Sequence, residues 1–288
     1  LGDAIGGAVK LALTLNGDHA AYVETNVSFT YYLVAAAAAE AAVQVSLVLP
    51  VAGPNAGGSL LNVSGQGFSF LGGVFCRFGL EERTVVGTLL SAALMQCRSP
   101  PIVSPLVGLT GSGPATQREL VQVTLNGQDY TTSSASFVAF DKARVRVSGV
   151  VPQGGPMDGG TLIVVSGEGF ADYNVHCRIG GDSLVRASVV NASALHCLTP
   201  ARGAAGSAAV EVTLNGDTSA HTLTSDGVSF AFFNASDVRI DSVSPLGGPS
   251  AGGTVVVLRG AGYVDRGGVF CRFGDDASSA VPATLQSP

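Results

Sequence analysis

The five cysteines carry the clearest chemistry in this sequence of 288 residues. Cys76 and Cys97 are separated by almost the same number of residues as Cys177 and Cys197, while Cys271 stands alone. Cysteines at a recurring spacing form disulfides, bind zinc together with histidines, or remain buried thiols in a reducing compartment. The cysteine spacing alone does not distinguish these alternatives, so the strands and turns around the cysteines have to be considered.

Two of the four histidines, His176 and His196, directly precede a cysteine. Neighbouring residues on a strand point to opposite faces. If the cysteines face the core, we expect both histidines to lie outside it and close together, where two ligands are too few for zinc. A zinc site of two cysteines and two histidines is also disfavoured, because ligands on opposite faces cannot converge.

Other polar or glycine-rich stretches give no motif for catalysis or for a cofactor. Gly65-Gln66-Gly67 and Gly167-Glu168-Gly169 lack the third glycine and the following helix of a dinucleotide-binding loop, and they indicate a turn or a bulge instead. Asp275-Asp276, and Asp237 with Asp241, lack the dense oxygen ligands of a calcium site. We therefore predict that the protein is not an enzyme, and that it has no cofactor and no metal.

Four asparagines begin the tripeptide that accepts N-linked glycans, and they are Asn26, Asn62, Asn191 and Asn234. Such tripeptides arise by chance in any chain rich in serine and threonine. Asn62 has further support from the strand orientation described below. A glycan would also cover a surface with few charges, so we predict that at least one of these sites is modified.

Composition narrows the class of protein. Charged residues make up 12% of the chain and the net charge is −6, which argues against a nucleic-acid partner. No apolar run is long enough to cross a membrane, so we expect no membrane contact within this segment. No signal peptide is visible, and the chain is expected to start in the middle of a domain.

The cysteines and glycines lie in a stretch that occurs three times. Each copy begins with Gly-Gly, continues through an aliphatic strand to a Gly-x-Gly-aromatic turn, and ends at a Cys-Arg pair. With the two residues that follow each Cys-Arg pair, the copies run from Gly57 to Gly79, from Gly159 to Gly180 and from Gly252 to Gly274. A repeat at about the length of one small domain indicates an array of similar modules.

Each module also begins and ends alike. A short strand that reaches proline and a Gly-Pro turn comes first, and an alternating strand closed by Asn-Gly comes last, followed by one more strand. Asn-Gly is the strongest short signal for a hairpin, so we expect every module to end in one. The prolines are Pro50, Pro152 and Pro245, and the asparagines are Asn16, Asn126 and Asn215. Strand number, alternation and turn spacing predict an all-β sandwich with almost no helix.

The repeat divides the chain into complete and partial modules. We expect the C-terminal part of a repeat at 1–34, an alanine-rich linker at 35–42, a repeat at 43–141, a repeat at 143–235 and the N-terminal part of a repeat at 237–288. The 43–141 repeat is the longer of the two complete ones. Its extra residues, rich in proline, glycine and serine, predict a long loop at 98–120.

The Gly-Gly strand can be oriented from its alternation. One set of positions is always aliphatic and is expected to face the core: Leu61, Val63, Ile163, Val165, Val256 and Leu258. The other set contains polar residues, among them Asn62, and is expected to face solvent.

Taken together, the Gly-Pro turn, the Gly-Gly-Thr strand, the Gly-x-Gly-Phe turn, the two cysteines and the closing Asn-Gly strand pair resemble the IPT/TIG family. This family occurs in plexins, the hepatocyte growth factor receptor and fibrocystin-type receptors, and in some transcription factors and bacterial polysaccharide enzymes. The resemblance covers almost the whole chain. It implies tandem immunoglobulin-like β-sandwiches used for adhesion, receptor architecture or dimerisation.

With the repeat in place, we predict one disulfide per module, Cys76 with Cys97 and Cys177 with Cys197. The partner of Cys271 is then expected just beyond the chain end. Disulfides place the chain in the secretory pathway, outside the cell or at its surface. Buried free thiols in a cytosolic protein remain the alternative.

Three functions are compatible with these modules. The first is a non-catalytic extracellular segment of a larger multi-repeat cell-surface protein, a semi-rigid disulfide-bonded rod for adhesion or receptor-type binding of proteins or glycans. The second is a structural subunit of an extracellular matrix, wall or surface filament, with self-association, since low charge and small residues suit lateral packing. The third is an intracellular DNA-binding or dimerisation module, which would need basic loops and reduced thiols.

Overall fold

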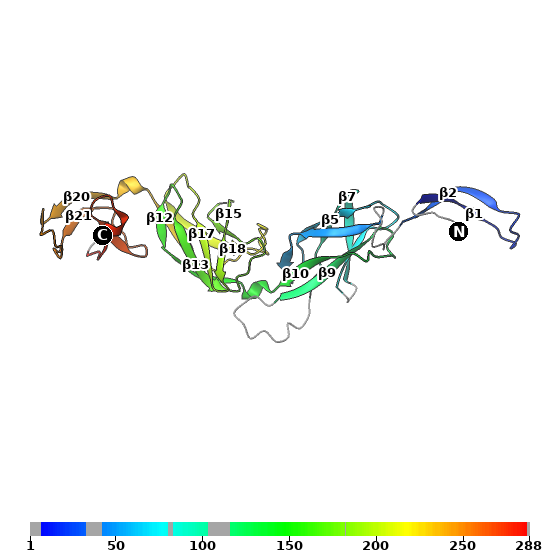
Figure 1. Cartoon of the computed structure of the whole chain (residues 1–288), viewed down its shortest axis with the longest axis horizontal. Coiled ribbons are helices and arrows are strands. Elements are labelled where there is room, and N and C mark those ends of the chain that lie inside the picture. Colours follow the sequence, from blue (N-terminus) through cyan, green and yellow to red (C-terminus); the bar gives the residue numbers. More distant parts are fainter. Residues whose placement is uncertain (1–6, 33–41, 80–82, 103–115, 182, 287–288) are drawn as a thin grey trace. The chain divides into compact units, whose positions relative to one another are not determined.

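The computed structural model describes residues 7–32, 42–79, 83–102, 116–181 and 183–286 (Figure 1). The described residues form two compact units, the first within 7–141 and the second within 142–286. Strands dominate the described residues. Their only helical elements are three short 3-10 turns, η1 (Lys142–Arg144), η2 (Ala235–Asp237) and η3 (Ala277–Ser279). The all-β class is therefore confirmed.

The first unit contains a sandwich whose two layers are joined by one long strand. Strand β7 (Arg83–Ser91) pairs with β6 through its first half and with β8 through its second half. The sheet therefore runs continuously in the order β3-β5-β8-β7-β6-β9-β10-β4. The other strands are β3 (Gln44–Leu49), β4 (Ala52–Pro54), β5 (Leu60–Gln66), β6 (Phe75–Phe78), β8 (Leu94–Arg98), β9 (Thr116–Thr124) and β10 (Ala135–Phe140).

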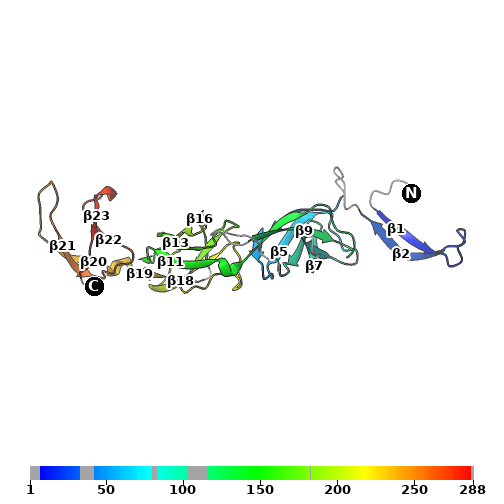
Figure 2. The ribbon, with the colours of Figure 1, turned by 90° about the horizontal axis from the view of Figure 1, so that it is seen from below.

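The second unit repeats this sandwich as two separate sheets (Figure 2). The counterpart of β7 is interrupted at Ala187, which leaves β15 (Leu184–Arg186) in one sheet and β16 (Ser188–Asn191) in the other. One sheet has the order β11-β13-β17-β16 and the other β12-β19-β18-β14-β15. Their remaining strands are β11 (Arg146–Val151), β12 (Gly154–Pro156), β13 (Leu162–Glu168), β14 (His176–Ile179), β17 (Ala194–Leu198), β18 (Gly206–Thr213) and β19 (Ser229–Phe233).

The core of each sandwich is lined by the inward positions of the Gly-Gly strand. Leu61, Val63, Ile163 and Val165 are fully buried and Asn62 is exposed, so the predicted orientation is confirmed in the two complete modules. Val256 and Leu258, in the partial module, are half-buried. Aromatic residues from the closing strand pair fill the opposite layer: Phe137 packs edge-on against Phe78 with ring centroids 6.0 Å apart. Each such buried side chain contributes about 1.5–3 kcal/mol of hydrophobic stabilisation.

The glycine after the core strand is required by a bulge in the neighbouring strand. The β11–β13 register shifts between Val147 and Gly149, and the β3–β5 register shifts at the equivalent place. A Cβ atom on Gly167 would overlap the backbone oxygen of Arg146 and the ring of Phe170. The glycines of this stretch therefore serve packing and backbone geometry, as the sequence indicated.

The Asn-Gly strand of each module pairs antiparallel with the strand that follows it, so the predicted closing hairpin is confirmed, although the connection is longer than a two-residue turn. The connection between β9 and β10 runs over residues 125–134, and that between β18 and β19 over residues 214–228. The asparagine instead caps the start of the loop: Asn126 Oδ1 accepts hydrogen bonds from Thr124 Oγ1 at 3.0 Å and from the Gln128 backbone N–H at 3.0 Å. Local signals favour a turn here, but the loop length depends on the whole module.

The predicted loop at 98–120 is also shorter than expected at its C-terminal end. Residues 116–120 belong to β9, and residues 103–115 lie outside the described part. Glu119 in this strand is buried, and its Oε1 lies 3.2 Å from Arg83 Nη1 and 2.6 Å from Gln117 Nε2. These partners allow a charged residue to continue the strand where sequence favoured a loop. Most of the predicted linker at 35–42 lies outside the described residues, and only Ala42 is placed, in a buried position.

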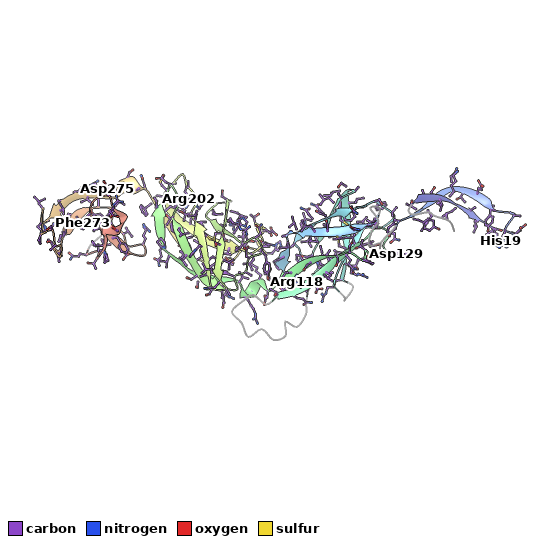
Figure 3. The ribbon with its side chains drawn as sticks, in the orientation of Figure 1. His19, Arg118, Asp129, Arg202, Phe273 and Asp275 are labelled. Atoms are coloured by element: carbon purple, nitrogen blue, oxygen red, sulfur yellow. A yellow bond between two sulfur atoms is a disulfide. The ribbon has the colours of Figure 1, made fainter. Side chains whose placement is uncertain are left out.

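Two further segments carry only some of the strands of a module among the described residues. One is the hairpin of β1 (Gly7–Leu13) and β2 (Val23–Tyr31). The other consists of β20 (Arg239–Ser244) paired with β21 (Val257–Ala261), and of β22 (Val269–Arg272) paired with β23 (Ala280–Ala283). Large apolar side chains are exposed in both, including Phe273 just after β22 (Figure 3).

Candidate functional site

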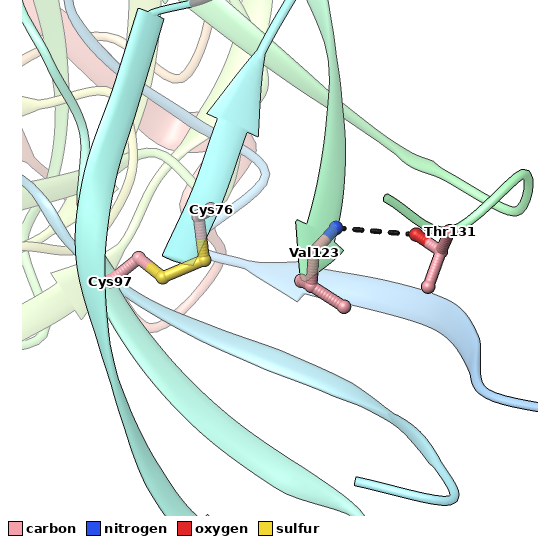
Figure 4. Close-up of a disulfide and its surroundings, with 4 residues drawn as sticks. All are labelled: Cys76, Cys97, Val123 and Thr131. Carbon is pink, nitrogen blue, oxygen red and sulfur yellow. Dashed lines mark hydrogen bonds between the residues drawn. A yellow bond between two sulfur atoms is a disulfide. The ribbon is translucent and has the colours of Figure 1, made fainter. Parts of the chain in front are cut away.

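Each complete sandwich contains one disulfide that joins its two layers. Cys76 on β6 is bonded to Cys97 on β8 (Figure 4), and Cys177 on β14 is bonded to Cys197 on β17. The Cα atoms are 6.4 Å apart in both pairs, and all four side chains are buried. The structure therefore contains the two pairs that the repeat suggested, in the position of a structural cross-link and not of a reactive thiol.

Val123 lies directly across the ladder from Cys76. Its backbone N–H donates to Thr131 Oγ1 at 3.2 Å, and its carbonyl accepts from the Thr131 N–H at 2.9 Å (Figure 4). Both backbone groups of Val123 therefore point away from β6. Cys76 and Val123 form a non-hydrogen-bonded pair, in which side chains approach most closely. The second module repeats this arrangement with Val212 and Thr224.

Cys271 on β22 is a free, half-exposed thiol. It occupies the position of Cys76 and Cys177 in the repeat. That its disulfide partner follows beyond residue 288 stays a prediction.

The two histidines beside the cysteines are not neighbours, and that expectation was wrong. His176 lies on β14 and His196 on β17, which belong to different sheets. Because the disulfide crosses the core between these sheets, the residues preceding its cysteines face outward on opposite sides. Among the described residues no cluster of three or more histidine, cysteine, aspartate or glutamate side chains could hold a metal ion.

The four glycan-acceptor asparagines lie at or near the surface. Asn26, Asn62 and Asn191 are exposed, and Asn234 is half-buried at the start of η2. Asn191 Oδ1 accepts hydrogen bonds from the Ser193 N–H and from Ser193 Oγ, both at 2.8 Å, in the turn between β16 and β17. Their accessibility is compatible with glycosylation, which remains a prediction for all four.

The arginine after each cysteine has a role that the sequence analysis missed, although the Cys-Arg pair recurs in all three copies. Arg77 donates to Gln122 Oε1 at 2.7 Å, and its guanidinium lies 4.0 Å from the centroid of the Tyr130 ring. Arg178 lies 2.6 Å from Glu211 Oε2 in the matching place. These contacts tie the outer face of β6 to β9, and that of β14 to β18.

The outer face of the β11-β13-β17 sheet is apolar at one end. Val151 lies opposite Val164, and Leu162 lies opposite Leu198 on adjacent strands. All four side chains are exposed. We call these four residues the outer apolar face. In the first unit Asn62, a predicted glycan acceptor, replaces Val164 at the same repeat position.

One hollow among the described residues is mostly apolar. A hollow in the first unit is lined by Phe70, Gly73, Val74, Phe75 and residues 86–89, without a carboxylate, imidazole or thiol. Backbone N–H donation from Gly268 and Gly267 lowers the pKa of Asp265, and donation from Ser278 lowers the pKa of Asp276, so these carboxylates cap turns. None of the helical elements in the described part is long and apolar enough to span a membrane.

One family matches most of the chain. The IPT/TIG domain matches residues 44–139 and 146–232, which are the two complete sandwiches.

Three solved structures are similar to this chain at low identity. Two show the plexin A4 full extracellular region, with 14% and 15% identity, TM-scores of 0.40 and 0.43, and 66% and 70% of this chain covered. The third is a tetra-tandem repeat in the extending region of a large adhesion protein, with 13% identity, a TM-score of 0.22, and coverage of 78% of this chain and 63% of that one. The chain spans only 18% and 16% of the two plexin chains.

Proposed function

Because the chain belongs to the IPT/TIG domain family, we propose that it is a non-catalytic extracellular segment of a larger multi-repeat cell-surface protein. In this proposal it binds other proteins or glycans in adhesion or as part of a receptor. The observation that carries the proposal is the buried disulfide in each complete module. Cytosolic thiols are kept reduced, so a pair of repeated structural disulfides favours the secretory pathway over an intracellular DNA-binding role.

The proposal includes a semi-rigid series of modules. The link before β20 is short and structured: Asn234 Oδ1 accepts from the Ser236 N–H at 3.1 Å at the start of η2. Within the second unit the Gln153 N–H donates to the Arg266 carbonyl at 2.6 Å, which connects the 143–235 repeat to the repeat that follows it. A short capped link with a backbone contact beside it supports limited bending at this junction.

Secretion with glycan attachment tests the compartment. The chain is expressed behind a secretory signal sequence, and its mass is compared before and after treatment with an N-glycosidase. We expect secreted protein that loses mass, and Asn62→Gln should remove part of this loss. A secreted chain without any glycan, or a chain retained in cells as reduced aggregates, would contradict the proposal.

A structural subunit of a matrix or surface filament is the second candidate, favoured by the outer apolar face. Such a face suits lateral packing against other chains. Exposed apolar residues that are scattered singly are common on protein surfaces, whereas four neighbouring ones favour a contact surface. The test is lateral assembly of the purified chain and its loss in Val164→Glu. If wild type and Val164→Glu sediment identically at all concentrations, lateral packing through this face is wrong.

A further inference from the structure

One glycine has a neighbour of opposite charge in the two complete modules. In the first module, a Cβ atom on Gly79 would overlap Glu119 Oε2, so this carboxylate lies against the glycine. In the second module the glycine at the same repeat position is Gly180, and a Cβ atom there would lie 3.6 Å from Arg202 Cζ. A guanidinium group therefore lies beside the glycine where the first module has a carboxylate.

The ion pair of the first module has no counterpart in the second. Glu119 is replaced by Ala208, since both lie opposite the buried phenylalanine of the closing strand. Arg83, whose Nη1 lies 3.2 Å from Glu119 Oε1, is replaced by Ser183, the exposed residue just before β15. Both members of the pair are therefore absent, and the short Ser183 side chain does not cover the side from which Arg83 approaches its carboxylate.

Arg202 (Figure 3) reaches this place from the segment that follows β17. Its backbone N–H donates to the Met157 carbonyl at 2.7 Å, as the Ile102 N–H donates to the Asn55 carbonyl at 2.7 Å in the first module. Ile102 is buried, so an apolar side chain in one module corresponds to a charged one in the other. The guanidinium Cζ lies 5.2 Å from the centroid of the buried Phe232 ring, which supports the charge through its π face.

The guanidinium of Arg202 has hydrogen-bonding capacity that is not used within the described part of the chain. Its Nη1 is buried and has no hydrogen-bond partner there. A buried donor of a charged group without a partner costs free energy, and a carboxylate is the acceptor that matches the guanidinium fork best. The neighbouring Phe232 and Ala208 side chains are apolar and supply no acceptor. Because the Arg202 side chain as a whole is only half-buried, a ligand can reach it from solvent.

We propose that Arg202 binds the carboxylate of an acidic side chain presented by a partner protein. The ligand completes in the second module the ion pair that Glu119 makes within the first, with the two charges exchanged in place. A protein side chain fits better than the carboxylate of an acidic sugar, because Phe232 and Ala208 can pack against methylene groups but cannot bind sugar hydroxyls.

This inference rests on the proposed binding role for the existence of the partner, and it names the chemical class that the partner presents. The site itself lies within one complete module. Secretion and glycan attachment are measured separately from binding at Arg202, so the failure of either proposal can be recognised without the other.

An NMR titration of the 288-residue chain, labelled with ¹⁵N in arginine and glycine, tests the site. The probe is N-acetylglutamate N-methylamide, and its uncharged glutamine analogue is the matched control. We expect the Arg202 Nε–H and Gly180 N–H signals to shift and to saturate with the glutamate probe in the millimolar range, because one charge-assisted contact binds weakly. The glutamine analogue should leave both signals in place.

Variants taken from the first module test the residues without disturbing the fold. Arg202→Ile introduces the residue found at position 102, so the Tm should change little, while the Gly180 signal should report binding weakened by at least about tenfold. Ala208→Glu supplies an internal carboxylate in the manner of Glu119 and should weaken binding by a similar factor. Ala208→Gln, of the same size without the charge, should bind more tightly than Ala208→Glu.

Three results would overturn the proposal. The first is affinity for the glutamate probe that is unchanged in Arg202→Ile or equal for the glutamine analogue. The second is a wild-type chain that shows no saturable shift, including one that binds only after Asp182→Asn, since the chain would then supply its own carboxylate from outside the described residues. The third is a shift caused by sialyllactose and not by the glutamate probe, which would assign the site to an acidic glycan.

Discussion

Removing the disulfide of the 143–235 module should destabilise that module alone. The double variant Cys177→Ala with Cys197→Ala opens a loop with a sequence separation of 20. In the chain-entropy model, losing a cross-link of this length costs about 3 kcal/mol of folding free energy. For a domain of this size, each kcal/mol lowers Tm by roughly 4–8 °C, so the expected fall is about 12–25 °C.

Calorimetry of the whole chain measures this effect, because the two complete modules should unfold in separable transitions. The matched variant Cys76→Ala with Cys97→Ala, whose separation is 21, should lower the other transition by a similar amount. Adding a reductant to the wild-type chain should reproduce both losses together. If either variant lowers the Tm of its own module by only a few degrees, or lowers the Tm of both modules equally, the disulfides do not stabilise independent modules and our reasoning is refuted.

Three further predictions concern the core, a close backbone approach and a buried tyrosine. Ile163→Ala should cost about 2–5 kcal/mol in denaturant unfolding because Ile163 is fully buried, whereas Val164→Ala on the outward face should cost less than about 1 kcal/mol; equal losses would contradict the strand orientation. Gly167→Ala should destabilise by more than about 1 kcal/mol, because the added Cβ meets the backbone of β11; an unchanged midpoint would contradict this close approach. Burial, and then the charge of Asp129, raise the pKa of Tyr32. The neutral tyrosine therefore stabilises the folded chain fully below the ordinary tyrosine pKa, and this contribution to the free energy of unfolding is lost as pH rises through the raised pKa. Tyr32→Phe should remove this alkaline loss in a pH series of thermal melts, and a loss that persists would assign it to other groups.

The fold could be predicted because its signals are local and occur three times. Alternation in the Gly-Gly strand decided which residues face the core, and Ile163 and Val165 are fully buried accordingly. Gly167 marks a close backbone approach that almost no other residue can accept. The repeat also predicts that four of the five cysteines form two disulfides and that the fifth, Cys271, has no partner within the chain. The structure contains those two disulfides.

The features that the sequence could not supply depend on contacts distant in the chain. Glu119 continues β9 because Arg83 and Gln117 bind its carboxylate. These contacts are not visible in the neighbouring sequence, which predicts a loop at this residue. The separation of His176 and His196 follows from the two sheets that the disulfide joins. Likewise, the role of Arg178 becomes visible only when β18 brings Glu211 beside it.

Counting free thiols in the unfolded, unreduced chain tests the central claim most directly. The chain is secreted from cells, denatured without reductant, treated with an alkylating reagent and weighed by mass spectrometry. The account predicts one alkylated cysteine, Cys271, and linked peptides that join Cys76 to Cys97 and Cys177 to Cys197. Alkylation of all five cysteines, or linkage between cysteines of different modules, would contradict a series of separately cross-linked extracellular IPT/TIG modules.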